Sequence, residues 1–458
     1  MAGRAEIRAI GPSYQLADKR TACQRSVNLY MAQVEGLGEA RQVILESAPG
    51  FASYLTMPGN VRGMRNVEGT LYVVAGTNLY SVSGGAYTLR GSGIAGAGYV
   101  AMTHGQSQLV MVNGTEGYVL NLDTMVFGQI TSTGWRGSYG ADYVDGYFIF
   151  VAPNTEQFYI SAIDDASSLD ALDFSSSDTQ PDSIIAHVVF KRELYLFGRV
   201  SCEPWVNSGD PDFPLVRYNV APIEIGIVGR QAFVVADDSI VFVGQTKTGR
   251  GYVYQMKGHQ PVRISDQAVE EAIAQATDIS QIVMWTYQTV GGEFVALHAP
   301  GMESTRVWDA STKQWHERAE WDDGWSPLRL DHVCTVGGVQ YGAGGAVIYT
   351  MDRDTATYAG SEIVLERTWP HLASGSLEPV SYRGLEVACT TGAGRATLEI
   401  SNDGGDVFGS PLLRSLGATG RRMERIRWLG LGTAIDRVFR LRFYGTAPFA
   451  LYAAAVDA

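Results

Sequence analysis

The sequence has few cysteines and no long apolar segment, the features typical of metal-binding, membrane and secreted proteins. It holds four cysteines, none in a C-x-x-C arrangement, which excludes zinc and redox sites of that spacing and indicates free thiols in a reducing compartment. No stretch approaches the roughly 18 consecutive apolar residues of a transmembrane helix, and the opening residues MAGRAEIRAIGPSYQ contain no apolar segment. We therefore expect no membrane insertion and no secretion by a standard signal peptide.

Lysine is also scarce, and the net charge has the wrong sign for a protein that binds nucleic acid over its whole surface. Five of the 35 basic residues are Lys, and the chain carries a net charge of −13. Nonspecific DNA binding depends on cationic side chains that release counterions, so the chain as a whole repels phosphate. The charge is uneven, because residues 361–458 carry 11 Arg against 10 Asp or Glu, a net +1, which leaves −14 for residues 1–360.

Glycine, by contrast, is abundant, with 53 residues, and it accompanies an internal repeat. A turn, a strongly apolar strand, a second turn and an amphipathic strand recur at intervals that average about 45 residues. The seven apolar strands are 71–76, 109–114, 147–152, 194–198, 240–244, 294–299 and 339–344. Four-stranded propeller blades repeat at about 40 to 50 residues, so the period predicts a β-propeller. Seven blades are favoured over six, and the competing interpretation is a pair of β-sandwiches with irregular turns.

One interval is longer than the others because it contains an amphipathic helix. The stretch 265–276, SDQAVEEAIAQA, places Val269 and Ile273 one turn apart. Ser265 or Asp266 before them suits the N-cap, because either side chain can accept a hydrogen bond from the first turn. We predict a helix inserted between two blades.

The repeat ends near residue 360, and the strand candidates after it are longer. Four longer strand candidates follow at 382–390, 396–402, 422–430 and 437–445, and the last two alternate in polarity. We therefore predict an all-β chain in three parts. These are an N-terminal arm at 1–60 that is available to close the propeller, a β-propeller at 61–360 and a small β-sandwich at 361–458.

The last two strand candidates hold the one basic concentration in the chain. The candidate interaction surface consists of Arg421, Arg422, Arg425, Arg427, Arg440 and Arg442. Aromatic neighbours such as Trp428 and Phe443 are typical of nucleic-acid surfaces, but Glu424 and Asp436 alternate with the arginines. A protein interface or a solvated face of the sandwich fits this pattern better.

No motif predicts catalysis or a cofactor. The stretch 91–96, GSGIAG, has the spacing of a dinucleotide loop, but a β-prone segment follows it where a helix is required. The stretch 401–408, SNDGGDVF, resembles the Asp-box of sialidases, which is a structural turn. A loop region rich in carboxylates is the remaining candidate for a Ca²⁺ site or a glycosidase pair, with Asp164, Asp165, Asp170, Asp173, Asp178 and Asp182. We expect no enzyme, cofactor or metal site, and the alternative is a glycan-binding or glycan-cleaving propeller.

Several longer blocks resemble one protein family. They are 26–35 (SVNLYMAQVE), 47–51, 101–114, 165–174 (DASSLDALDF), 177–198, 203–214 (EPWVNSGDPDFP), 249–273 and 307–321 (VWDASTKQWHERAEW). In these blocks the chain is similar to the tail hub proteins of short-tailed phages, the podoviruses. The same proteins are called packaged DNA stabilisation proteins or tail accessory factors.

The resemblance implies a structural component of the virion tail that is assembled in the host cytoplasm. Proteins of this kind form a ring, usually a cyclic homo-hexamer, below the portal and its head-to-tail adaptor. They help to retain packaged DNA, form part of the ejection channel and attach the tail needle and the tailspike or fibre proteins. An acidic channel wall agrees with this role, because genomic DNA passes transiently and is not held by counterion release.

Overall fold

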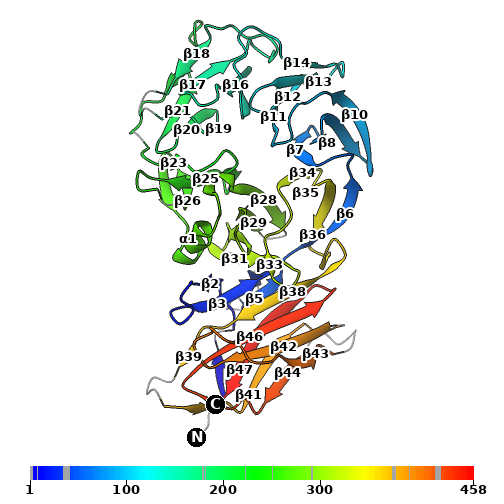
Figure 1. The fold of residues 1–458 in the computed structure, drawn as a ribbon, viewed down its shortest axis with the longest axis vertical. Helices are drawn as coiled ribbons and strands as arrows, with labels where there is room; N and C mark the ends of the chain where they lie inside the picture. Colours follow the sequence, from blue (N-terminus) through cyan, green and yellow to red (C-terminus); the bar gives the residue numbers. More distant parts are fainter. Residues whose placement is uncertain are drawn as a thin grey trace.

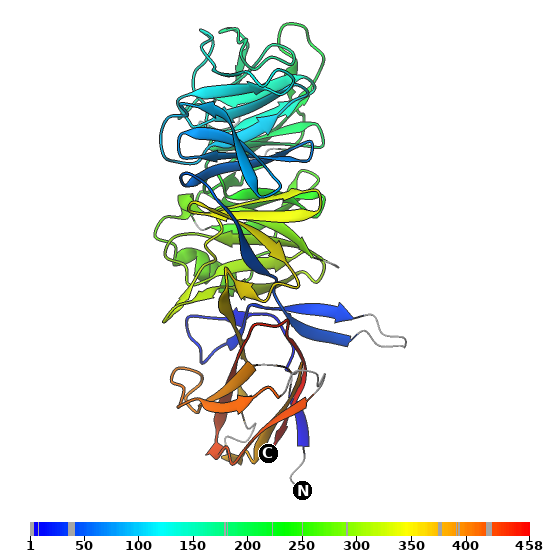
Figure 2. The same ribbon diagram turned by 90° about the vertical axis from the view of Figure 1, so that its right-hand side faces the viewer.

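The computed structural model describes the chain apart from residues 1–3, 8, 35–41, 178–179, 181, 222, 250, 290–291, 374–377, 391, 393 and 418–423. Strands dominate the described residues and form a β-propeller with a β-sandwich beneath it (Figure 1). The predicted fold class, an all-β propeller followed by a C-terminal β-sandwich, is confirmed. Figure 2 shows the two parts stacked along the long axis of the molecule.

Seven four-stranded antiparallel units form the propeller, as the repeat predicts. The first strands, which line its centre, are β7 (Val61–Val67), β11 (Ala101–His104), β15 (Ala141–Val144), β19 (Ala186–Phe190), β24 (Phe233–Ala236), β28 (Val283–Thr289) and β34 (His332–Val336). The second strands are β8 (Thr70–Ala75), β12 (Gln108–Val112), β16 (Tyr147–Val151), β20 (Glu193–Phe197), β25 (Ser239–Gln245), β29 (Gly292–His298) and β35 (Val339–Gly344).

The outer half of each blade consists of a third and a fourth strand. The third strands are β9 (Asn78–Ser83), β13 (Gly117–Asn121), β17 (Gln157–Ile160), β21 (Cys202–Asn207), β26 (Tyr252–Lys257), β30 (Thr305–Asp309) and β36 (Val347–Asp352). The fourth strands are β10 (Ala86–Ser92), β14 (Phe127–Gln129), β18 (Phe174–Ser176), β22 (Leu215–Arg217), β27 (Gln260–Arg263), β31 (Gln314–Arg318) and β6 (Gly50–Thr56). A short strand, β23 (Gly226–Ile227), adds to β25.

The predicted apolar strands are the second strands of the blades. They are buried almost throughout, as in β8 and β25, because each lies inside a blade that is covered by its neighbours on both faces. Among the described residues, two-residue turns lead into five of the second strands, and both residues of each turn have positive φ, as right-twisted hairpins require. These turns are Glu68–Gly69, Asp145–Gly146, Lys191–Arg192, Asp237–Asp238 and Gly337–Gly338.

The N-terminal part of the chain closes the propeller. Strand β6 supplies the fourth strand of the seventh blade and pairs antiparallel with β36 from Val347↔Thr56 to Asp352↔Gly50. The seventh blade therefore combines residues from both ends of the propeller sequence.

The predicted helix is α1 (Gln267–Ala274), between the fifth and sixth blades, followed by the 3-10 turn η1 (Ile279–Gln281). Its N-cap is Asp266, whose carboxylate accepts a 2.9 Å hydrogen bond from the Val269 N–H.

The sandwich consists of two sheets. The first sheet has the order β4 (Leu29–Val34), β5 (Gln42–Ser47), β47 (Ala450–Asp457), β41 (Gly384–Cys389) and β44 (Glu424–Leu429), and β1 (Arg4–Ile7) also pairs with β47. The second sheet is built around β46 (Asp436–Gly445), with β38 (Ser361–Thr368), β39 (Leu372–Ala373), β42 (Gly394–Ser401) and β43 (Leu412–Ser415). All four strands expected after residue 360 are present.

Strand β3 (Cys23–Val27) joins the two parts of the molecule. It pairs in parallel with β31 of the sixth blade and antiparallel with β38 of the sandwich, so that one sheet of 16 strands runs through both. Strand β37 (Thr357–Tyr358) makes a second link, because it pairs with both β6 and β38. Three short pairings complete the strands: β2 (Tyr14–Gln15) with β3, β32 (Glu320–Trp321) with β33 (Trp325–Ser326), and β40 (Val380–Ser381) with β45 (Thr433–Ala434).

The largest hydrophobic core crosses this junction. It contains Phe294 and Tyr349 from the propeller together with Leu365, Trp428 and Phe439 from the sandwich, all buried. Residues 1–60 contribute to both sides of it, since β6 belongs to a blade while β1, β4 and β5 belong to the sandwich. The propeller and the sandwich are therefore packed as one unit.

Candidate functional site: the junction and its surfaces

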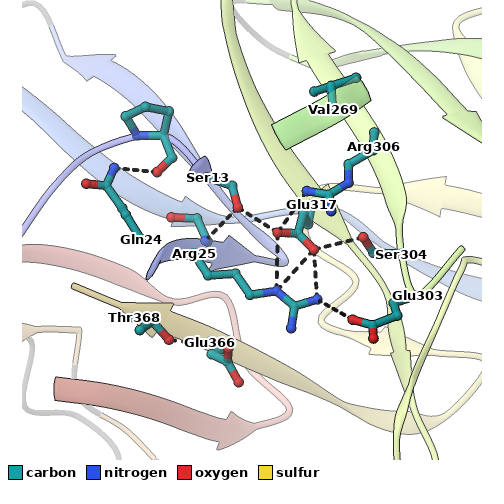
Figure 3. A network of polar contacts seen from close by, with 12 residues as sticks. Ser13, Gln24, Arg25, Val269, Glu303, Ser304, Arg306, Glu317, Glu366 and Thr368 are labelled. Carbon is teal, nitrogen blue, oxygen red and sulfur yellow. Dashed lines mark hydrogen bonds and ion pairs between the residues drawn. The ribbon is translucent and has the colours of Figure 1, made fainter. Parts of the chain in front are cut away.

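A buried ion network lies where β3 enters between the propeller and the sandwich (Figure 3). The carboxylate of Glu317, on the outermost strand of the sixth blade, accepts hydrogen bonds from Arg25 Nη2 at 2.8 Å and Nε at 3.1 Å. Arg306 Nη1 lies 3.1 Å from the same carboxylate. The hydroxyl groups of Ser13, at 2.6 Å, and Ser304, at 2.8 Å, complete its surroundings. The N-terminal segment and two strands of the blade thus converge on one anion.

The network is held in its charged form. Burial alone would raise the pKa of Glu317, but the charges of Arg25 and Arg306 outweigh burial and hold that pKa well below its usual range. Burial also opposes the charge of Arg25, yet Glu317 and Glu366 together raise its pKa. A carboxylate that stays ionised over the neutral range is unsuited to proton transfer, so the geometry supports a structural connection.

Two further buried side chains fasten the N-terminal segment to the junction. The guanidinium of Arg367, on β38, donates to the carbonyl of Ala9 at 3.0 Å and of Gly11 at 3.1 Å, and to the Ser26 hydroxyl at 2.7 Å. Burial lowers the pKa of Arg367 to about 9. Asn28, at the corner between β3 and β4, is fully buried and has a φ of 57°. Its side-chain amide donates to the carbonyls of Ala319, which follows the last strand of the sixth blade, and of Val364 in the sandwich.

The structure distributes the predicted Arg-rich surface over two sheets. Arg425 and Arg427 lie on β44 of the first sheet, are exposed, and pair with Glu386 at 3.3 and 3.1 Å. Arg440 and Arg442 lie on β46 of the second sheet. Arg421 and Arg422 fall outside the described residues.

The two arginines of β46 are largely buried at the junction. Arg442 Nε donates to Glu366 at 2.8 Å, and its guanidinium lies 4.7 Å from the ring centre of Trp321, which belongs to the propeller side. Arg440 pairs with Glu399 and stacks on Phe408 at 3.7 Å. The described arginines of the candidate interaction surface therefore lie in two places: Arg425 and Arg427 are exposed on β44, and Arg440 and Arg442 lie within the junction.

Asp165, Asp170 and Asp182 of the loop region 164–182 accept hydrogen bonds from backbone N–H groups, and Asp164 accepts one from the Tyr143 hydroxyl. Asp165 accepts from the N–H and the hydroxyl of Ser167, and Asp182 accepts from the N–H of Val200 at 2.6 Å. Asp170 accepts from the N–H of Leu172 at 2.9 Å. Asp178 lies outside the described residues. Carboxylates that accept hydrogen bonds within the protein in this way give no support to the glycosidase pair that the sequence allows.

The centre of the propeller is occupied by side chains around two small cavities. One, of about 490 Å³, is lined by residues from all seven first strands, and a second has about 810 Å³. Tyr99, Tyr139 and Arg230 line both cavities and so lie between them. The guanidinium of Arg230 stacks on the ring of Tyr139 at 3.2 Å. Both volumes are in the range of small-molecule sites, about 300 to 1,000 Å³.

The first cavity contains a buried carboxyl group next to a histidine. Asp142 Oδ2 lies 3.7 Å from His187 Nε2. Burial raises the pKa of Asp142 to about 7, against the opposing charge of Arg65. Burial likewise lowers the pKa of His187 to about 4. Both groups therefore favour their neutral forms in mildly acidic solution.

We expect Asp142→Asn to stabilise the protein in a pH-dependent way. A pKa raised from 3.8 to about 7 corresponds to about 4 kcal/mol against the ionised form. Because the side chain is 26% exposed to the cavity, we expect about half of that, about 2 kcal/mol. A raised carboxyl pKa costs stability only when the group ionises, so the gain is absent below about pH 4, grows up to pH 7 and is constant above it.

Urea unfolding of both proteins at pH 5 and pH 8 measures this gain. Asp123→Asn, at an exposed turn, is the matched control and should show no such dependence. A gain for Asp142→Asn that is equal at both pH values would contradict a carboxyl group destabilised by burial.

Of the junction residues, the sequence singled out only Arg440 and Arg442, and it assigned them to an interaction surface. Asn28 lies inside the family-like block 26–35 and Glu317 lies inside the block 307–321, so these blocks include junction residues but do not show which residues pair. Among the described residues, no three His, Cys, Asp or Glu side chains are grouped so as to hold a metal ion. None of the helices that the structure describes is long and apolar enough to span a membrane.

The fold and the junction together define a class: a two-domain β protein in which a closed seven-bladed propeller and a sandwich are packed as one unit. Family models give the particular family. The model of the bacteriophage P22 Gp10 β-propeller matches residues 23–329, and the model of the Gp10 β-sandwich matches residues 368–458. The chain belongs to the bacteriophage P22 Gp10 family of phage tail proteins. The resemblance to tail hub and packaged DNA stabilisation proteins is thereby confirmed.

Other comparisons add only distant likenesses. No curated protein sequence matches the chain significantly. The N-terminal domain of Nup159 has 9% identity and a TM-score of 0.41, with 76% of this chain and 99% of that chain covered. The extracellular domain of BT4673 from B. thetaiotaomicron has 10% identity and a TM-score of 0.46, with 73% and 43% covered. TM-scores this low carry no argument about function.

Proposed function

We propose that this chain is the tail hub of a short-tailed phage and that six copies close into a ring around the path of the DNA. The observation that carries the proposal is the match to the Gp10 family over both domains, at residues 23–329 and 368–458. In this role the chain is a structural part of the virion tail and acts without catalysis. Its assembly takes place in the host cytoplasm.

The closed centre of the propeller supports a ring of several copies. Its two cavities, of about 490 and 810 Å³, are lined by side chains such as Tyr99 and Arg230. A DNA duplex has a major groove that alone is about 12 Å wide, so it does not fit through one propeller. A protein that surrounds DNA must therefore do so between subunits. A cyclic arrangement needs a heterologous interface that closes on itself.

The charge distribution supports passage of DNA without adhesion. Residues 1–360 carry a net charge of −14, so a ring wall formed by the propellers repels phosphate. We propose that the hub binds the head-to-tail adaptor of the portal on one side and the tail needle and tailspike or fibre proteins on the other. Together they retain the packaged genome until ejection.

Purified particles test this proposal. We expect mass spectrometry to find the chain in virions and electron microscopy to place a six-fold ring of it below the portal adaptor. Particles assembled without it should lose their DNA, which the ratio of empty to filled heads measures. Absence of the chain from purified virions would overturn the proposal, and a normal proportion of filled heads without it would remove the role in DNA retention.

A further inference from the structure

The larger of the two central cavities, of about 810 Å³, lies where the first strands of the propeller begin. Its lining includes Tyr99, Tyr139, Gln231 and Gln281. Each of these residues stands two positions before the first strand of its blade, which is β11, β15, β24 or β28. Four blades therefore present a hydrogen-bonding side chain at the same place in the repeat, and the four side chains gather at one end of the propeller's centre.

Three of these four side chains have polar groups that are not used within the protein. Among the described residues, the hydroxyl groups of Tyr99 and Tyr139 and the side-chain amide of Gln231 have no hydrogen-bond partner. Tyr99 is 41% exposed, yet burial raises the pKa of its hydroxyl, so its free surface faces the cavity and not bulk water. These groups are therefore free to bond to a molecule inside the cavity.

Two arginines give this cavity positive charge. Arg199 and Arg230 both line it, and both also line a smaller cavity of about 300 Å³, so the two residues border the same space. Both are exposed, and neither has an ion-pair partner among the described residues. The guanidinium of Arg230 is held in position because it stacks on the Tyr139 ring, whose centre lies 3.2 Å away.

Two carboxylates also line these cavities, but neither pairs with the arginines. Asp182 lines the smaller cavity, and its carboxylate accepts a hydrogen bond from the Val200 N–H at 2.6 Å. Asp331 lines the larger cavity and lies 3.8 Å from His298 Nε2, and burial raises the pKa of Asp331, which opposes its ionisation. Residues 1–360 carry a net charge of −14, so two neighbouring arginines without carboxylate partners form a local positive site in an acidic region.

We propose that the larger central cavity binds a small molecule through a phosphate group held by Arg199 and Arg230. A guanidinium presents a planar fork of donors that matches the oxygens of a phosphate in pairs. A phosphate ester carries a charge of about −1.5 to −2 at pH 7, so one group balances both cations, whereas a carboxylate balances one. The Tyr139 hydroxyl and the Gln231 amide supply further hydrogen bonds, and the volume leaves room for the rest of a small phosphorylated molecule. This site is complete in one chain and does not require the proposed ring.

Isothermal titration calorimetry of the purified chain with inorganic phosphate, in a buffer without other oxyanions, tests the site. We expect one saturable site per chain and an affinity that falls at least tenfold in Arg199→Gln and in Arg230→Gln. Both side chains are exposed, so both variants should fold. Arg217→Gln is the matched control, because Arg217 is exposed on β22, the outer strand of the fourth blade, and has no ion-pair partner among the described residues. It should bind phosphate with unchanged affinity.

Two further titrants identify the chemistry of the ligand. Acetate should compete at least tenfold less well than phosphate, because it carries a single charge. Tighter binding of ribose 5-phosphate than of inorganic phosphate, lost in Arg230→Gln, would assign the site to a phosphate ester, whereas equal or weaker binding would assign it to the free anion. No saturable binding of either compound would overturn the proposal. The same holds if Arg217→Gln loses binding as fully as Arg230→Gln does, or if acetate competes as well as phosphate.

Discussion

Replacing Glu317 by Ala is expected to lower the free energy of unfolding by about 4 kcal/mol, because it leaves Arg25 and Arg306 as buried cations without their anion. The Glu317 side chain is 1% exposed and those of Arg25 and Arg306 are 9% and 11% exposed, so solvent does not replace the lost partner. Equilibrium unfolding in guanidinium chloride, followed by tryptophan fluorescence, measures the loss. Since one core spans the junction, we expect a single transition shifted to lower denaturant.

The effect should depend on pH with a defined sign. The pKa of Glu317 is depressed in the folded protein, so its stabilising contribution is complete above its unfolded value of about 4.3 and is lost as the pH falls below that. The difference between the natural protein and Glu317→Ala should therefore be constant from pH 6 to 8 and shrink on acidification. A difference that is constant down to pH 3 would contradict an ionised Glu317.

Glu303→Ala is the matched control for this network. Its carboxylate lies 3.9 Å from Arg25 Nη2, but its side chain is 65% exposed. Exposed ion pairs contribute about 0 to 1 kcal/mol, so we expect a loss in that range. Equal losses for Glu303→Ala and Glu317→Ala would mean that the buried ions do not stabilise the junction.

The propeller could be predicted from sequence because its signals are local. The second strands are apolar on both faces, as in IVFVG, and the turns before them recur at a regular spacing. The first strands escaped detection because they are mixed in polarity, as in ADYV of β15, where three of four residues are only half-buried. Strand β47, ALYAAAVD, escaped for another reason: alanine has little β-propensity, and its central place in the sheet provides the burial.

The junction could not be predicted because it depends on contacts between remote parts of the chain. Arg25 and Glu317 are 292 residues apart, and Arg367 bonds to the carbonyl of Ala9 across 358 residues. The polar and apolar residues alternate in the last two predicted strands, and this alternation correctly predicted that both segments are strands. It could not predict which of the two sheets each strand would join. Consequently Arg425 lies on the open edge of the sandwich while Arg442 lies within the junction. Local patterns predict elements and faces, whereas assignment to sheets depends on tertiary pairing.

Asn28→Ala is the second substitution for which we expect a large effect, a loss of about 4 to 5 kcal/mol in the free energy of unfolding. The Asn28 amide donates to the carbonyls of Ala319 at 2.8 Å and Val364 at 2.9 Å. Its oxygen accepts from the Ala319 N–H at 3.0 Å and from the Tyr358 hydroxyl at 2.8 Å. Alanine leaves these buried groups without partners, at about 1 to 3 kcal/mol for each group left unsatisfied, and is strained at a φ of 57°.

Two variants separate the hydrogen bonds from the backbone strain. Asn154→Ala replaces an exposed asparagine with a φ of 60°, so it retains the strain without the buried partners, and we expect a loss of about 1 kcal/mol. Asn28→Gly removes the strain but loses the same hydrogen bonds, and it should recover about 1 kcal/mol relative to Asn28→Ala. If Asn28→Ala costs no more than Asn154→Ala, the hydrogen bonds of Asn28 contribute nothing. If Asn28→Gly restores full stability, strain alone explains the loss. The predicted order, with Asn28→Ala worst, Asn28→Gly close behind and Asn154→Ala mild, follows only if the asparagine amide itself joins the blade to the sandwich.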